Sequence, residues 1–317
     1  MRESSRFAMT ALALAGVLAV QATQAAAASG SAPWPGSSVE RGRAVYAKSC
    51  AACHGDMGDG RSPAAAYLAP RPRDFTSGTF KFRSTPNGEL PTDADLLLVI
   101  DQGVPGTSMP AWKDVLSASE RADVVAYIKT FAEDFGAGAP APIVVPEPPE
   151  FSPIAVTEGR MIYMLMECWA CHGGKGRGDG ASGKTLEDDW GRKILPWDLT
   201  KDRYKAGNDP KSLYRTFTTG LNGTPMPAYA LDGFLIAGDT PVDPAKYAEA
   251  YGPSDIEQLK EWLAGQPGEA ALGRMRGAEK AALGERRKWA LVYYIRSLVQ
   301  KPGIFSRLFV LDPEATP

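Results

Sequence analysis

The chain has 317 residues, of which 44% are hydrophobic and 23% are charged, and its formal net charge is −2. This composition is typical of a globular protein, and without a Lys/Arg block it gives no electrostatic support for a nucleic-acid partner. Only four cysteines and two histidines are present, which excludes any mechanism that needs three or more imidazoles from this chain.

The first 28 residues are predicted to be an export signal. Two arginines precede an apolar run from Phe7 to Val20, and small residues lead to a cleavage site after Ala27 or Ala28. The run is shorter than the roughly 20 residues of a membrane helix, although an uncleaved anchor stays an alternative. We expect a periplasmic or otherwise exported protein, soluble after signal cleavage and without a transmembrane helix in the mature chain.

Every Cys and every His of the chain lies in one of two Cys-x-x-Cys-His motifs: Cys50, Cys53 and His54, and Cys168, Cys171 and His172. Two thiols at this spacing beside an imidazole are the attachment signature of c-type haem. The thiols form thioether bonds to the haem, and the imidazole becomes a ligand of its iron. The motifs therefore predict two covalently bound haem c groups.

Three other uses of these cysteines are weaker. Disulfides suit an exported protein but leave both histidines without a role. A single zinc site would need motifs 114 residues apart to meet, whereas each motif alone offers only three ligands. A thiol redox motif is the third alternative.

The chain contains the same unit twice. The segment Leu96–Ala111 aligns without gaps to Leu213–Ala228, and similar residues precede and follow each Cys motif. We therefore predict a first domain at 36–135, a Pro-rich linker at 136–153 and a second domain at 154–300, followed by a tail at 301–317. An insertion around 230–286 enlarges the second copy, either as a packing elaboration or as a surface for a partner.

The elements along the chain are predicted to be helices, because no sustained alternation of apolar and polar residues indicates a large sheet. Capping boxes predict helix starts at Ser117 and Ser254, and 289–299 is the expected last helix. The fold class is therefore mostly α, with two tandem domains joined by the Pro-rich linker.

A methionine is the best candidate for the second axial ligand of each iron, since no spare His or Cys remains. Met109 and Met226 both occur in the pattern Gly-x-x-Gly-Thr-x-Met-Pro-Ala, at similar distances after His54 and His172. A thioether in this position raises the haem potential. Core packing is the alternative role for both methionines.

With these motifs the sequence resembles a diheme cytochrome c made of two class I-like cytochrome c domains. The resemblance implies an N-terminal helix around Gly42 or Gly159 that crosses a C-terminal helix around Tyr127 or Tyr294. It also implies that the carbonyl of a proline after the motif orients the proximal imidazole. Pro63 suits that role in the first domain, whereas the second domain has no proline there.

Four further residues are candidates for the haem surroundings. Lys81 and Lys205 follow the recurring Asp-x-Thr segments and suit the haem propionates. Trp112 and Tyr229 directly follow the two methionine loops. Surface charge and ordinary packing are the alternative roles of these residues.

The resemblance favours a carrier of single electrons between redox partner proteins, with no catalytic residue of its own. It would serve a membrane or periplasmic oxidoreductase complex, either as a shuttle or as its cytochrome subunit. A diheme enzyme, such as a peroxidase or a sulfur-compound dehydrogenase with one reactive haem, is the alternative. A ligand sensor is a third class.

Overall fold

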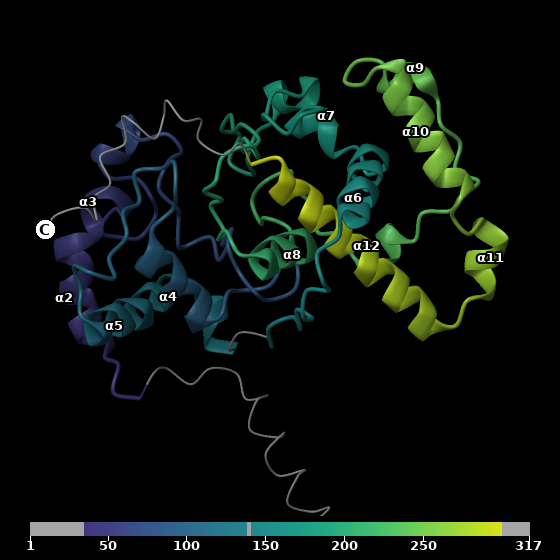
Figure 1. The fold of residues 1–317 in the computed structure, drawn as a ribbon. Helices are drawn as coiled ribbons and strands as arrows, with labels where there is room; N and C mark the ends of the chain where they lie inside the picture. The colour runs from purple at the N-terminus through teal and green to yellow at the C-terminus, as the bar shows by residue number, and fades with distance from the viewer. Residues whose placement is uncertain (1–34, 138–140, 300–317) are drawn as a thin grey trace, which may run out of the picture.

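The computed structural model describes residues 35–137 and 141–299. The predicted export signal and the predicted tail at 301–317 lie outside these residues. Figure 1 shows two helical units side by side, which we call the first unit (35–137) and the second unit (153–299). The described residues contain no strand, only an isolated bridge between Glu187 and Lys193. This agrees with the predicted mostly α class.

The first unit contains four α-helices and three short 3₁₀ helices. The α-helices are α2 (Val39–Ser49), α3 (Ala51–His54), α4 (Asp93–Gln102) and α5 (Ala118–Ile128). The 3₁₀ helices span Ala64–Tyr67, Lys129–Phe131 and Glu133–Ala137. Long loops connect α3 to α4 and α4 to α5, and the Met109 segment lies in the second of these loops.

The second unit repeats this order and adds helices. Its α-helices are α6 (Pro153–Leu165), α7 (Cys168–His172), α8 (Pro210–Thr219), α9 (Pro244–Tyr247), α10 (Pro253–Ala264), α11 (Glu269–Arg274) and α12 (Gly277–Ser297). Its 3₁₀ helices span Ala181–Thr185 and Leu231–Phe234. Helices α9 to α11 belong to the inserted chain and lie on the side of the second unit away from the first (Figure 1).

Glycines allow the first and last helices of each unit to cross closely, as the resemblance implied. A Cβ atom at Gly42 of α2 would lie 2.0 Å from the carbonyl oxygen of Asp123 in α5. A Cβ atom at Gly159 of α6 would lie 2.0 Å from the carbonyl oxygen of Ala290 in α12. No side chain fits at such distances, so both crossings depend on glycine.

One of the two predicted helix starts is confirmed and the other is wrong. Ser117 caps α5, with its side chain accepting from the Glu120 amide. Helix α10 instead begins with Pro253 after Gly252, and the Asp255 carboxylate accepts the Gly252 N–H at 3.0 Å. Proline suits a first helical position because its missing N–H would have no partner there, so the helix starts before Ser254.

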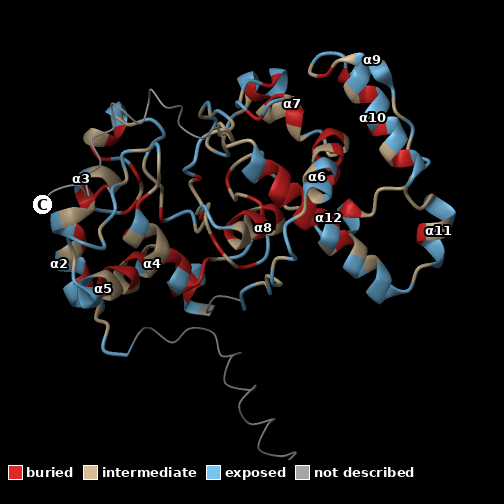
Figure 2. Cartoon of the chain, viewed as in Figure 1, coloured by how far each residue is buried: buried red, intermediate tan, exposed pale blue. Residues whose placement is uncertain are grey.

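The last helix is longer than predicted. Helix α12 begins at Gly277 rather than near Trp289, so most of the mixed-charge stretch before Trp289 is helical. Figure 2 shows why sequence periodicity misses this part, since the buried positions of α12 lie mostly in its second half. The exposed first half carries no apolar stripe from which a helix could be recognised.

The inserted helices pack on the second unit. Tyr247 and Tyr251 lie about 6 Å from Trp169, which stands between the two cysteines of the second motif. Leu259 of α10 is fully buried in the same apolar cluster as Trp289. These contacts support a packing role for the insertion. Among the described residues, no helix has the length and apolar character needed to cross a membrane.

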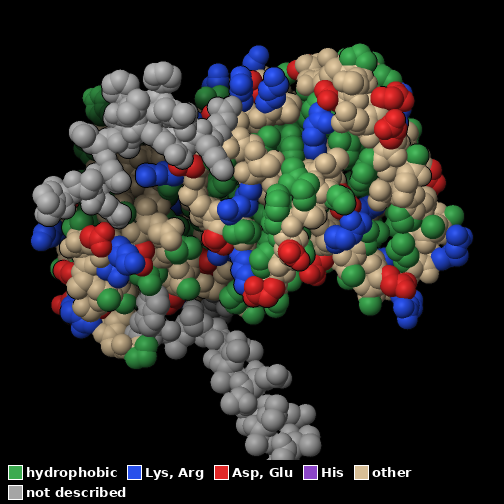
Figure 3. All heavy atoms as spheres, viewed as in Figure 1, with side chains coloured by type: hydrophobic (Ala, Val, Ile, Leu, Met, Phe, Trp, Pro, Cys, Tyr) green, Lys and Arg blue, Asp and Glu red, His purple; other side chains and the backbone are tan. Residues whose placement is uncertain are grey.

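The segment that joins the units contacts both of them. The Ile143 amide donates to the Ser84 carbonyl of the first unit at 2.8 Å. Further along, the Tyr293 hydroxyl of α12 donates to the Pro149 carbonyl, and Phe151 packs edge-on against the Tyr293 ring. Residues 141–152 contain no helix or strand. Figure 3 shows acidic and basic side chains intermixed over the visible face of both units.

Candidate functional site

Each Cys motif forms a short helix that places its thiols and imidazole on the unit's interior. Cys50 precedes α3, and the amides of Cys53 and His54 both bond to its carbonyl, at 3.1 and 2.9 Å. The second motif forms α7, from Cys168 to His172. Residues three or four apart in a helix lie on one face, so the helical turn brings these groups to the same side.

A cavity of about 210 Å³ opens beside the first motif. It is lined by both thiols, by His54, by Met109 and by Trp112. Most other walls are apolar, including Phe75, Phe80, Leu96, Ile100 and Val124. An apolar cavity with a few convergent polar groups suits a planar cofactor, and these residues fit haem c.

The imidazoles of the two motifs are oriented by backbone carbonyls other than the one predicted. His54 Nδ1 lies 3.0 Å from the Arg73 carbonyl oxygen, and His172 Nδ1 lies 3.1 Å from that of Trp197. The prediction for Pro63 is therefore wrong, and so is the expectation that the second unit differs. Because a carbonyl only accepts, Nδ1 carries the proton and Nε2 keeps a free lone pair.

A recurring turn holds each of these carbonyls in place. The Asp74 carboxylate accepts the Thr76 amide at 2.9 Å and the Thr76 hydroxyl at 2.6 Å. Asp198 makes the same two bonds to Thr200, at 3.0 and 2.7 Å. The repeated Asp-x-Thr segments therefore fix the chain directly after each carbonyl acceptor.

Burial keeps both imidazoles, and the first thiol of each motif, in their neutral forms. It lowers the pKa of His54 and His172, so both rings are uncharged at pH 7. Burial also raises the pKa of the Cys50 thiol to about 11 and that of Cys168 to about 12. A thiol with a raised pKa is a poor nucleophile in exchange reactions, which argues against the thiol redox alternative.

The donor arrangement also disfavours the remaining alternatives. No two of the four cysteines are joined by a disulfide. In the part of the chain that the structure describes, no group of three or more His, Cys, Asp or Glu side chains converges as a zinc site requires.

The two methionine loops have the same conformation. Gly103 and Gly220 open them, each with φ of 65°, and the amide after each glycine donates to the methionine carbonyl, at 3.0 Å in the first unit and 3.1 Å in the second. Thr107 and Thr224 accept the amides of Met109 and Met226, at 3.1 and 3.3 Å. Met226 is half-buried against the second core, and Met109 lines the first cavity.

A tyrosine that the sequence comparison missed supports each Cys motif. The Tyr46 hydroxyl donates to the carbonyl of Gly55, directly after His54, at 2.7 Å. The Tyr163 hydroxyl makes the same bond to Gly173 at 2.7 Å. A Gly-Arg pair precedes each Cys motif, at 42–43 and 159–160, and a tyrosine follows three residues after each pair. This repeated spacing is the signal that identifies the two tyrosines.

A cation of the last helix, also missed, supports the end of each methionine loop. Arg121 donates to the Lys113 carbonyl at 2.9 Å, and the Lys288 ammonium donates to the Tyr229 carbonyl at 2.7 Å. Arg121 and Lys288 stand six positions before Tyr127 and Tyr294, the tyrosines that the two copies share, so the internal repeat again carries the signal.

The four candidates for the haem surroundings lie in two places. Trp112 lines the first cavity, and Tyr229 packs on the second core near Cys168 and Cys171. Lys81 and Lys205 both line the first cavity, although Lys205 belongs to the second unit. The structure therefore brings the two lysines together rather than placing one in each unit.

Known proteins share these features. The family described as cytochrome C oxidase, cbb3-type, subunit III matches residues 37–128, and the family described as cytochrome c matches residues 156–266. A chain of the reducing HAO-like protein complex of Kuenenia stuttgartiensis is 37% identical, with a TM-score of 0.63. That alignment covers 82% of this chain and 96% of the other. No curated protein matches the chain.

The sequence motifs, the repeated helix crossing and these matches agree. A chain of which 96% aligns at 37% identity shares a family and not only a fold. The protein belongs to the cytochrome c family, as a diheme cytochrome c with two tandem cytochrome c domains and two covalently attached haem c groups.

Proposed function

We propose that this cytochrome is a periplasmic carrier of single electrons between redox partner proteins. The observation that supports this most directly is the duplication of the whole ligand geometry. In both units a neutral imidazole is oriented by a backbone carbonyl, and a rigid loop presents a methionine. A site with both axial positions filled by the chain leaves no place for a substrate at the iron.

The residues have the following proposed roles. Two thioether bonds attach each haem: to Cys50 and Cys53, and to Cys168 and Cys171. His54 and His172 are the proximal ligands, and Met109 and Met226 the distal ones. Haem c, once bound, supplies a one-electron iron couple. The chain orients its ligands, excludes water with apolar walls and sets the potential through the thioether and the nearby charges.

A place in a larger oxidoreductase complex is the partner role that we propose. Support comes from the solved relative, which is a chain of a complex of HAO-like proteins. Fractionation of the native host, followed by co-purification, tests both the location and the partner.

Carbon monoxide binding to the reduced protein tests the carrier function against the alternative of a diheme enzyme. With both axial positions filled, neither haem should bind the gas rapidly. Met109→Ala and Met226→Ala are positive controls, since each opens one iron position. Rapid stoichiometric binding at one haem of the unmodified protein would contradict the carrier function and favour an enzyme with one reactive haem.

A further inference from the structure

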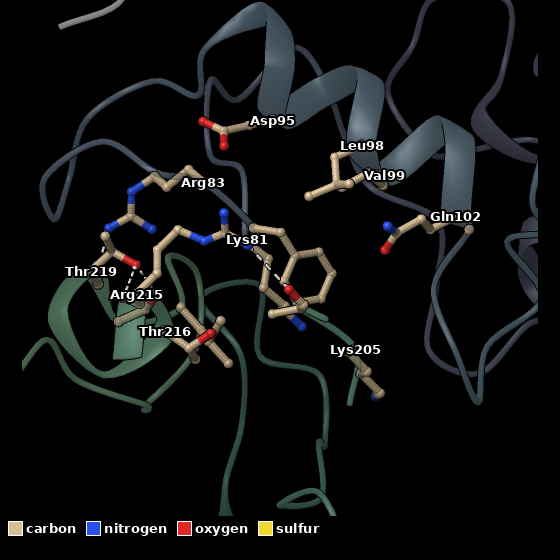
Figure 4. A pocket seen from close by; sticks show the side chains of 15 residues that line it. Lys81, Arg83, Asp95, Leu98, Val99, Gln102, Lys205, Arg215, Thr216 and Thr219 are labelled. Carbon is tan, nitrogen blue, oxygen red and sulfur yellow. Dashed lines mark hydrogen bonds between the residues drawn. The ribbon is translucent and has the colours of Figure 1, made fainter. Parts of the chain in front are cut away.

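The two units meet through loops that lie close to the first cavity. The Arg83 guanidinium of the first unit donates to the Thr219 carbonyl at the end of α8, at 2.5 Å. The Gly88 amide donates to the Asn222 side chain at 3.2 Å. Figure 4 shows α4 on one side of this junction and α8 on the other, with Lys81, Arg83 and Lys205 between them.

Three cations from both units gather beside the cavity. Arg73 and Lys81 come from the first unit and Lys205 from the second, and all three line the cavity that also contains His54. Burial lowers the pKa of Lys81 to about 8, with a further part of this shift due to the positive charges of Arg73 and Lys205. Burial also lowers the pKa of Lys205.

No carboxylate of residues 35–137 and 141–299 forms an ion pair with this cluster. Among the described residues, none lies within 4 Å of the charged nitrogens of Arg73, Lys81 or Lys205. Asp188 is the acid that acts on both Arg73 and Lys81, but its carboxylate already accepts two backbone amides, at 3.1 and 2.9 Å. Arg73 also stacks on the Trp190 ring, 4.6 Å from its centre. Buried like charges without a carboxylate partner are unfavourable, so an anion between these cations would stabilise the cluster.

An unpartnered hydrogen-bond donor stands next to the same cluster. The buried Nε1 atom of Trp197 has no hydrogen-bond partner, and the Lys205 ammonium lies 4.7 Å from the centre of the Trp197 ring. A buried N–H without an acceptor is costly. This donor thus lacks an acceptor beside a lysine that lacks a carboxylate partner.

Trp197 also connects the two sites. Its ring packs on Gly106 of the Met109 loop, where a Cβ atom would lie 2.5 Å from the ring edge. Its carbonyl accepts from His172 of the second unit. The side chain that stacks with Lys205 thus contacts the methionine loop of one unit, while its backbone holds the proximal imidazole of the other.

We propose that Lys205 of the second unit, together with Lys81 and Arg73, binds a carboxylate of the haem held by the first unit. Docking of the two units then completes the first haem site. The cations favour the reduced iron, which carries one positive charge less, and so they raise the potential of the first haem. This inference rests on ligation of that haem by His54, as proposed above.

A spectroelectrochemical redox titration of the full-length protein tests the inference. Met109→His identifies the first-unit component, because replacing a methionine ligand lowers the potential of that haem. Lys205→Gln should lower the potential of the same component, so that its ratio of reduced to oxidised haem at a fixed applied potential falls by about threefold or more. Lys205→Arg should retain the unmodified value.

Lys201→Gln is the matched control. Lys201 also lies over the Trp197 ring, at 5.7 Å, but it is exposed and does not line the cavity. Its loss removes one positive charge from beside the same tryptophan and should leave the potential of the first-unit haem unchanged. Lys205→Met, which keeps most of the apolar stem, should reproduce the effect of Lys205→Gln if the glutamine variant folds poorly.

Two outcomes would overturn the inference. In the first, the potential of the first-unit haem changes no more in Lys205→Gln and Lys205→Met than in Lys201→Gln. The other is a shift confined to the second-unit component. Either result, found with two intact methionine-ligated haems, leaves the carrier function in place. Loss of the methionine signature in the unmodified protein would instead contradict the ligand assignment itself.

Discussion

The Nδ1 atom of His172 lies 3.1 Å from the carbonyl oxygen of Trp197, and the indole ring of that residue packs against the methionine loop of the other unit. One residue thus orients the imidazole of His172 through its backbone and supports the Met109 loop through its side chain. Because the acceptor is a backbone atom, side-chain substitutions near it act on the imidazole only by moving the chain.

Loosening the turn after the acceptor should alter the iron potential in the first unit. Asp74→Ala removes both bonds to Thr76, so the Arg73 carbonyl should hold His54 less firmly. A weaker bond lowers the basicity of the imidazole, and we expect a higher potential for the first-unit haem in a redox titration. Pro63→Ala is the control and should leave the potential unchanged; an effect of equal size there would restore a role for the proline.

The two methionines should contribute equally to the weak red-edge charge-transfer band of the oxidised protein. Met109→Ala and Met226→Ala each remove one thioether, and each should therefore remove about half of the band, because the two loops have the same hydrogen bonds. Absorbance spectroscopy of the oxidised variants measures this directly. A full band in either variant would rule out that methionine as a ligand.

The sequence could predict the local parts of both sites and not the parts that depend on packing between the units. The Cys motifs and the methionine loops are contiguous segments that occur twice, so covalent chemistry and glycine conformations are readable from them. The position of Lys205 beside the first cavity follows from how the units dock. Similarly, no local pattern marks Arg73 or Trp197 as acceptors, since any residue carries a carbonyl.

The two predicted helix starts also show how far local sequence patterns can be used for prediction. The Ser117 box was predictable because its hydroxyl and the carboxylate three residues later are both used. At α10 the serine pattern is present, but the residue that caps the helix is Gly252, two positions before Ser254, and Pro253 is the first helical residue. Two signals compete there, and only the stereochemistry of proline decides between them.

The close helix crossings should be intolerant of even one methyl group. Gly42→Ala and Gly159→Ala each place a Cβ atom 2.0 Å from a backbone oxygen, which forces the helices apart and should destabilise the unit by about 2–4 kcal/mol. Urea denaturation followed by circular dichroism measures the loss. Gly273→Ala in α11 is the matched control, because nothing lies within 4 Å of its added Cβ; equal destabilisation there would show that the crossings are not special.

The hydroxyl of Tyr163 should stabilise the turn that follows the second Cys motif. Tyr163→Phe keeps the ring and removes only the bond to the Gly173 carbonyl, which leaves a buried oxygen without that donor. We expect a loss of about 1–3 kcal/mol in unfolding free energy, measured by urea denaturation. Tyr67→Phe is the control because this ring is 90% exposed, and it should change the stability very little.

The buried Lys288 should make the stability of the second unit depend on pH. Burial lowers the pKa of its ammonium from 10.5 to about 8, so between these two pH values the unfolded chain binds the proton more tightly than the folded chain. The unfolding free energy should therefore rise as pH increases from about 8 to 10.5 and be lowest below that window. Lys288→Met removes the titrating group, so the unfolding free energy of the unmodified protein should rise relative to that of the variant across this range.

Urea denaturation at pH 7.5, 9 and 10.5 measures this difference, with exposed Lys260→Met as the control. A pH-independent difference would mean that Lys288 keeps an ordinary pKa in the fold, and that its bonds to Tyr229 and Thr218 compensate for its burial.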